Sequence, residues 1–338
     1  MSAAVQSPRP VAPAGARTPG RPSAATLTRL APLGLALLLL AVLAIRTPAA
    51  LSGAALASAL TQAAPIAVIG MALSLVIIAR GDDAVTGGID LSLAATAALA
   101  SAVLTKALAE WGVAFPQALL LVVALAVAVG AINAGFVEGI GLTPILATLA
   151  TSVLVSGVIR VVTTNRRTTT DAPVIVAIRD SEVLGVPVAI LVAALVLLVL
   201  HALVHWTAFG ARLRAVGGNR DASEVSGLRP RPYVVAAFLA AAAIAGLDGV
   251  LLTARASGFS PGMEDQLLVD MVLVAYLSPV FSRRATVTPL GAFLSAILVA
   301  VLSNSLILAR VDNSWVYGVK GALILAVVVA SALSRGRR

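Results

Sequence analysis

Residues 54–79 read AALASALTQAAPIAVIGMALSLVIIA, and not one of these side chains is charged. An α-helix rises about 1.5 Å per residue, so roughly 20 apolar residues cross the hydrocarbon core of a bilayer. This run is long enough to do so. In lipid the backbone must satisfy its own hydrogen bonds, which a helix does within one segment. The run therefore predicts a transmembrane helix.

Nine more apolar segments lie on either side of this run. The ten predicted spans are 29–46, 54–79, 88–109, 113–137, 142–162, 186–206, 232–254, 266–282, 287–309 and 314–333. Only 12% of the residues are charged, whereas a soluble domain carries about 25%. We therefore expect an all-α polytopic membrane protein of about ten transmembrane helices. Gly, Pro and Thr interrupt the ends of the third and fifth spans, so either could be broken or re-entrant.

Composition and motifs exclude several classes of protein. The net charge is +9, but the arginines lie mainly between apolar runs, where they set membrane topology rather than bind nucleic acid. Cysteine is absent, which excludes disulfides and thiolate metal sites. His201 and His205 are one helical turn apart, and an interfacial role is favoured over a metal site. The chain contains no P-loop, His-Glu-x-x-His or Gly-x-Ser-x-Gly motif, so we expect no catalytic residue, cofactor or ATP hydrolysis.

The predicted spans define a tail and one membrane domain. Residues 1–27 are rich in Pro, Ala, Ser and Arg, which predicts a disordered basic tail. Residues 28–334 form a single transmembrane domain, with long connections at 163–185 and 207–231. If the N-terminus is inside, fifteen of the Lys and Arg residues lie on the cytoplasmic side and eight outside. The positive-inside rule therefore places both termini and the 207–231 loop in the cytoplasm.

The 207–231 loop has a pattern of its own. Residues 221–228 can form a short helix on the membrane surface, which Gly217-Gly218-Asn219 precede and Pro230 and Pro232 stop. The alternative is a solvated basic loop that only orients the protein.

Polar residues in the spans are informative because each is costly in hydrocarbon and tends to line a path or a helix interface. Asp90 follows Gly87 and Gly88, which can break a helix, and its carboxylate can cap the helix that comes next. Asn133 lies among small residues and can hydrogen-bond across a close helix contact. Further polar residues near or inside spans are Asp248, Asp270 and Asn304. Such carboxylates leave an ion-coupled transporter open as an alternative.

Four stretches resemble one known family, in the family's order. VTGGIDLSLAATAALAS, residues 85–101, is similar to the T-G-G-I-D-L-S signature of ribose-type ABC permeases. GAINAGFVEGIGLTPILATLAT, residues 130–151, resembles that family's Gly-rich helix with Asn, followed by Pro and an Ala-Thr-Leu run. FGARLRAVGGNRDASEVSGL, residues 209–228, resembles its cytoplasmic loop. Asn304, Lys320 and the apolar residues around them resemble its last two spans.

The resemblance implies an assembly of the type II ABC importer kind in the bacterial inner membrane. Such a permease pairs with a second permease subunit, with two cytoplasmic ATP-binding subunits or one fused double ATPase, and with an extracytoplasmic sugar-binding protein. The 207–231 loop would hold the coupling helix that docks onto the ATPase. The coupling residues would be Gly217, Gly218, Asn219, Ala222, Ser226 and Gly227. We expect the translocation path or a helix break at Gly87, Gly88, Asp90, Ser92, Asn133, Thr143, Pro144 and Thr148.

The sequence departs from this family in one loop. The family has a G-G-T-S-x-x-G-G loop between its eighth and ninth spans, whereas residues 276–287 read YLSPVFSRRATV and contain no glycine. Because glycine reaches backbone conformations that are costly for other residues, this loop must fold differently. The family's Asn-Gly is also altered, to Asn133-Ala134. These departures favour one half of a heterodimeric permease over a diverged homodimer.

We therefore expect the permease subunit of an ATP-driven importer for a sugar or related polyol. Its partners would be the ATPase, the binding protein, a second permease and membrane lipids, but no nucleic acid. The alternatives are an ABC permease for branched-chain amino acids or nucleosides, and an ion-coupled secondary transporter.

Overall fold

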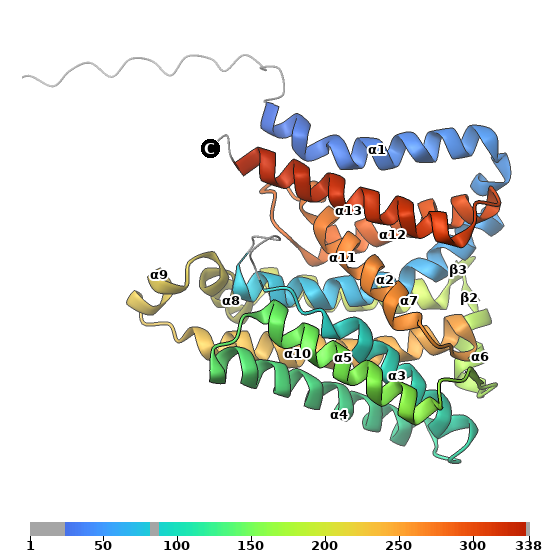
Figure 1. Ribbon diagram of the computed structural model, residues 1–338, viewed down its shortest axis with the longest axis horizontal. Coiled ribbons are helices and arrows are strands. Elements are labelled where there is room, and N and C mark those ends of the chain that lie inside the picture. Colours follow the sequence, from blue (N-terminus) through green and yellow to red (C-terminus); the bar gives the residue numbers. More distant parts are fainter. Residues whose placement is uncertain (1–23, 82–87, 336–338) are drawn as a thin grey trace, which may run out of the picture.

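The computed structural model describes residues 24–81 and 88–335. Long helices run side by side in alternating directions (Figure 1). At one end of the molecule lie the short helices α8 (Ala208–Gly218) and α9 (Arg220–Val225), together with the start of α1 and the end of α13. The opposite end carries α6 (Pro173–Asp180) and the hairpin of β2 (Glu182–Val183) and β3 (Val186–Pro187). We refer to them as the α9 end and the α6 end.

Each of the ten predicted spans coincides with a helix in the described chain. These helices are α1 (Ala24–Arg46), α2 (Gly53–Arg80), α3 (Ser92–Ala109), α4 (Phe115–Ala134), α5 (Pro144–Thr163), α7 (Val188–Trp206), α10 (Pro230–Ala256), α11 (Met263–Leu277), α12 (Pro289–Leu308) and α13 (Asn313–Arg335). Seven are long and apolar enough throughout to cross a membrane: α2, α3, α4, α5, α7, α10 and α12. α1 and α13 contain shorter apolar stretches. The prediction of an all-helical membrane fold is confirmed.

Helix α2 forms the centre of the bundle. It packs against α10, α12, α7 and α11, and from Ala63 to Ala79 every residue is buried. A helix that is apolar on all sides belongs in such a place, since it has no polar face to turn toward water. By contrast, α4, α5 and α7 expose large apolar side chains such as Leu120, Val153 and Leu195. Lipid is the solvent that suits these outer faces.

Short elements complete the chain between the long helices. They are the 3-10 helices η1 (Pro48–Leu51) and η3 (Ser278–Phe281), the π-helix η2 (Gly135–Ile140), and the strands β1 (Thr168–Thr169) and β4 (Gly258–Phe259). β1 pairs antiparallel with β4, which ties the 163–185 connection to the segment after α10. Arg179 adds a 2.7 Å hydrogen bond from Nη1 to Ser257 Oγ. The long connection at the α6 end is therefore held against the bundle.

The helix boundaries correct two of the expectations. Helix α3 begins at Ser92, and residues 88–91 before it are not helical but are largely buried. Thus the third span is irregular at its start, where protein covers the backbone, and neither α3 nor α5 is broken inside. The fourth span ends in the π-helix, which continues α4 directly. The expected tail 1–27 reaches into α1, which begins at Ala24, and residues 1–23 lie outside the described chain.

Candidate functional site

The 207–231 loop folds as two helices with a capped corner between them. Asn219 caps α9, because its Oδ1 accepts a 2.9 Å hydrogen bond from the backbone N–H of Ala222. Such caps are worth about 1 kcal/mol. Ser223 is buried on the inner side of α9 and donates from Oγ to the backbone oxygen of Ala215 in α8 at 2.9 Å. The predicted short helix is confirmed, and α9 is fixed on α8.

The residues that bound the short helix agree only in part with the prediction. Gly217 and Gly218 precede it as predicted, and they are the last two residues of α8. Helix α9 ends at Val225, and Gly227 follows with φ of 85°, the left-handed conformation that glycine reaches without strain. Pro230 is the first residue of α10, a place that suits proline because the N–H it lacks would have no helical partner. The prediction that Pro230 and Pro232 stop the short helix was wrong.

Helix α9 presents a small exposed face. Ala222 and Ser226 are one turn apart and both exposed, and Val225 beside them is 91% exposed. An apolar side chain so exposed at the tip of the α9 end offers a contact for another protein. The sequence reasoning missed Val225. A single valine in a polar loop does not by itself predict a contact surface, because whether its side chain is exposed depends on the fold.

A buried carboxylate joins α9 to the long helices. The Glu138 side chain is 2% exposed and lies in the π-helix that ends α4. It accepts hydrogen bonds from Arg220 Nη1 and Nη2, both at 3.0 Å, and from Arg80 Nη1 at 2.9 Å. The hydrogen bonds to Glu138 raise the pKa of the Arg220 guanidinium. Glu138 therefore connects the first residue of α9 with the last residue of α2.

This cluster was not predicted from the sequence. Glu138 entered the sequence analysis only as part of the 130–151 stretch that resembles the family. A lone acidic residue directly after an apolar run, at an end rich in arginine, does indicate an ion pair. π-helical turns are uncommon and concentrate at functional sites. The position of Glu138 in such a turn is a second reason to assign it a role.

A polar network surrounds the start of α3, where four predicted residues meet. Asp90 Oδ1 accepts hydrogen bonds from the Ser92 N–H at 2.9 Å and from Ser92 Oγ at 2.7 Å. Asn133 of α4 donates from Nδ2 to Ser92 Oγ at 2.7 Å. Thr148 of α5 accepts from the Leu91 N–H at 3.0 Å. All four side chains are buried. The network therefore holds the irregular 88–91 segment between α4 and α5.

The other predicted path residues have separate places. Gly88 packs against Arg80 so closely that a Cβ would overlap the arginine side chain. Pro144 is the buried first residue of α5, while Thr143 before it is exposed and makes no capping hydrogen bond from its side chain. Gly87 lies outside the described residues.

We expect Thr148→Val to destabilise the protein by about 1–2 kcal/mol, because the Leu91 N–H loses its acceptor in a buried place. Thr148 Oγ1 also donates to the Ile89 backbone oxygen at 3.3 Å. Thermal unfolding in detergent measures the change. Thr151→Val is the matched control one turn along α5, because Thr151 bonds only to its own helix, at Ala147. Equal shifts in the two variants would show that the 88–91 segment does not depend on Thr148.

Of the other polar residues in the spans, Lys320, Asp270 and Asn304 form contacts between helices. Lys320 of α13 pairs with Asp270 of α11 at 2.6 Å, and both residues are buried. Asn304 of α12 donates from Nδ2 to the Ala55 backbone oxygen at 2.9 Å and accepts from Gln62 at 3.2 Å. Asp248 is fully buried in α10, and within residues 24–81 and 88–335 neither of its oxygens has a hydrogen-bond partner.

The two histidines stack on each other near the end of α7. Their ring centroids are 4.3 Å apart, and His205 Nδ1 lies 3.1 Å from the His201 backbone oxygen. Across the part of the chain that the structure describes, no three His, Cys, Asp or Glu side chains form a group that could hold a metal ion.

Comparison with known proteins agrees with this architecture. The family described as "Branched-chain amino acid transport system / permease component" matches residues 55–328. The probable ABC transporter permease protein y4mJ of Sinorhizobium fredii is 26% identical, covering 92% of this chain and 91% of its own. The ribose import permease protein RbsC of Haemophilus influenzae is 25% identical over 87% and 90%, and the D-allose transport system permease protein AlsC of Escherichia coli is 26% identical over 73% and 76%. The chain therefore belongs to this family, as the non-catalytic permease component of a binding-protein-dependent ABC importer.

Proposed function

We propose that this permease carries a monosaccharide or related polyol, and that its α9 end is the cytoplasmic face that docks onto the ATPase. The relatives named for ribose and D-allose support a sugar as the cargo. The family description names branched-chain amino acids instead, so these are the second candidate cargo. The family assignment supports ATP-driven over ion-coupled transport.

The charge distribution supports the orientation. The α9 end carries Arg80 at the end of α2, Arg212 and Arg214 within α8, and Arg283 and Arg284 in the loop before α12. Cytoplasmic loops carry such an excess of arginine. Both ends of the described chain lie on the same side (Figure 1), which supports two cytoplasmic termini. The α6 end then receives the sugar-binding protein.

The observation that carries the docking proposal is the rigid corner of α8 and α9, with Val225 exposed at its tip. A coupling element must transmit force, so it has to be attached to the long helices, and Glu138 provides that attachment. We infer two ATP-binding subunits or one fused double ATPase as partners. A second permease of different sequence completes the pair, because the glycine-free 276–287 loop suits one specialised half.

Cross-linking tests this assignment cleanly because the chain has no native cysteine. We expect Val225→Cys, in the assembled transporter, to cross-link to the ATPase subunit. Leu184→Cys is the matched control, since Leu184 is 99% exposed in the hairpin of the α6 end. It should react with the binding protein and not with the ATPase. Cross-linking of Leu184→Cys to the ATPase would reverse the orientation, and failure of both variants would refute docking through α9.

Uptake into proteoliposomes tests the cargo. Transport of labelled D-ribose or another monosaccharide should require ATP inside, the binding protein outside and no ion gradient. Uptake of a labelled branched-chain amino acid, with no uptake of sugars, would instead support the second candidate.

A further inference from the structure

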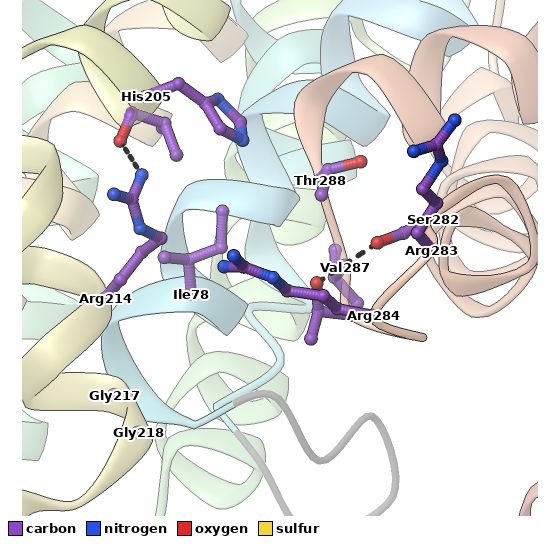
Figure 2. Close-up of a pocket in the computed structure, with 12 residues that line it drawn as sticks. Ile78, His205, Arg214, Gly217, Gly218, Ser282, Arg283, Arg284, Val287 and Thr288 are labelled. Carbon is purple, nitrogen blue, oxygen red and sulfur yellow. Dashed lines mark hydrogen bonds between the residues drawn. The ribbon is translucent and has the colours of Figure 1, made fainter. Parts of the chain in front are cut away.

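A basic cavity opens at the α9 end, beside the coupling loop. Its volume is about 630 Å³, within the range of roughly 300–1,000 Å³ that small-molecule sites occupy. Its walls come from α2, α7, α8 and the loop before α12 (Figure 2). The loop is the 276–287 segment in which this sequence departs from the ribose-type pattern. We call this cavity, lined by Arg214, Arg283 and Arg284 among others, the arginine pocket.

The loop takes a conformation of its own without glycine. It begins with the 3-10 helix η3, and Ser278 Oγ fastens its two ends by accepting from the Thr288 N–H at 3.1 Å. Ala285 has φ of 59°, a left-handed conformation that is unusual for a residue with a Cβ. This turn directly follows Arg283 and Arg284. Both arginines line the cavity, with Arg284 extending across it and the Arg283 guanidinium pointing away from that of Arg284 (Figure 2).

The charge of the arginine pocket has one sign. Of the described residues that line it, none is acidic, and three are arginines. Arg214 is fixed by a hydrogen bond from Nη1 to the Val204 backbone oxygen. In Figure 2, Arg284 extends across the cavity toward Ile78. Within the described chain, Arg283 and Arg284 form no ion pair. The pocket thus offers arginine charge that the described protein does not neutralise.

The N-terminus of α12 adds to the positive electrostatic potential in the pocket. Thr288 lines the pocket and caps α12, whose Gly291 N–H donates to Thr288 Oγ1 at 3.0 Å. The N-terminus of a helix carries about half a positive charge and favours anions. The lining also includes the apolar side chains of Ile78, Val204 and Val287, beside the polar side chains of His205, Ser282 and Thr286. A ligand that suits this lining combines an anionic group with apolar carbon.

The pocket lies at the depth of a lipid headgroup. Trp206 ends α7, directly after two residues of the pocket wall, and is 78% exposed. Tryptophan concentrates at membrane–water interfaces, where one side of its ring contacts lipid and the other water. Helix α9 lies at the outermost tip of its end of the bundle (Figure 1). We therefore expect the pocket, beside Trp206, to lie level with the lipid headgroups, and the exposed tip of α9 to meet a soluble partner.

We propose that the arginine pocket binds the phosphate of an anionic phospholipid, of the phosphatidylglycerol or cardiolipin class, from the leaflet around the α9 end. Basic pockets between transmembrane helices take such headgroups. The phosphate contacts Arg284 and Arg214 beside the start of α12, and the glycerol carbons contact Ile78 and Val287. The lipid then joins α2, α8 and the loop before α12, three elements around the coupling corner. This proposal needs neither the cargo nor the ATPase to be identified.

Native mass spectrometry of the delipidated full-length protein tests the proposal, with phosphatidylglycerol and zwitterionic phosphatidylcholine as probes. We expect the wild type to retain phosphatidylglycerol in preference. The Arg283→Gln/Arg284→Gln variant should bind it at least about tenfold more weakly, since each arginine near an anionic lipid surface contributes roughly a fivefold factor. Arg166→Gln/Arg167→Gln is the matched control, because it removes two adjacent arginines that follow α5 at the α6 end, away from the pocket. Its affinity should stay within about twofold of the wild type.

Further arms separate the sources of the anion. Arg283→Lys/Arg284→Lys should retain most of the binding, which distinguishes loss of charge from loss of fold. Equal weakening in both Gln variants would overturn the proposal, as would unchanged binding in Arg283→Gln/Arg284→Gln. Displacement of the lipid by inorganic phosphate at equal concentration would assign the pocket to a free anion. Displacement by the ATPase subunit alone would assign it to protein docking.

Discussion

Replacing Gly217 by valine should reduce ATP-driven uptake to background. Helix α8 lies backbone to backbone on the last turn of α2, and a Cβ at position 217 would overlap the Ile78 backbone oxygen. Backbone cannot swing aside as a side chain can, so α8 must move away from α2 and take α9 with it. Overpacking of this kind costs about 1–3 kcal/mol in stability. Under the proposed docking through α9, the larger effect is on transport, because the corner of α8 and α9 then moves away from the surface that the ATPase contacts.

The neighbouring glycine is the matched control. A Cβ at Gly218 would meet nothing within 4 Å, and in a helix most residues are more favourable than glycine, by up to about 1 kcal/mol. Gly218→Val should therefore leave uptake and the thermal midpoint close to those of the wild type. Uptake into proteoliposomes and thermal unfolding measure the two variants together. Similar uptake by both would mean that the close approach of α8 to α2 has no part in coupling.

Gly217 and Gly218 illustrate a limit of prediction from sequence. The sequence pattern predicted a coupling segment that contains both residues, and it did not distinguish between them. Only the packing distinguishes them, because one faces α2 and the other faces open space. The periodicity of a short loop does not reveal which side of it meets a helix whose residues lie more than a hundred positions earlier.

The long helices could be predicted for a simple physical reason. Each span must satisfy its own backbone hydrogen bonds in lipid. A span can therefore be recognised from the length and apolar content of a run of consecutive residues. The polar network at the start of α3 was partly predictable as well. Asp90 and Ser92 are two residues apart and their capping is local. The contributions of Asn133 and Thr148 depend on α4 and α5 packing beside α3. The local pattern predicted that Asn133 hydrogen-bonds across a close helix contact, whereas only the resemblance selected Thr148.

The ion pairs that join different helices could not be predicted, because their partners are distant in sequence. Arg80 and Glu138 are 58 positions apart, and Glu138 and Arg220 are 82 apart. Lys320 and Asp270 likewise come from different helices. Each residue could be recognised as costly in or near the membrane, but the choice of partner is decided by how the helices cross.

Glu138 provides the second large effect that we expect. Glu138→Gln keeps the shape of the side chain and removes its charge, leaving Arg220 and Arg80 without their shared carboxylate. The side chain of Arg220 is 43% exposed and that of Arg80 24%, so solvent screens both ion pairs. We expect the free energy of unfolding to fall by about 1–2 kcal/mol. If α9 is held on the long helices through this group, ATP hydrolysis should continue in the assembled transporter while uptake falls roughly tenfold, a typical size for coupling between sites.

The matched control is Glu224→Gln on the same helix. Glu224 also pairs with Arg220, at 3.6 Å, but its side chain is 55% exposed and the pair lies within α9, so this change should have little effect on uptake. A double-mutant cycle between Glu138→Gln and Arg220→Gln should then give a larger interaction energy than one between Glu224→Gln and Arg220→Gln. If instead ATP hydrolysis and uptake fall in the same proportion in Glu138→Gln, the carboxylate supports only the fold. If they separate, with hydrolysis intact and uptake lost, Glu138 transmits the movement of α9 to the membrane helices.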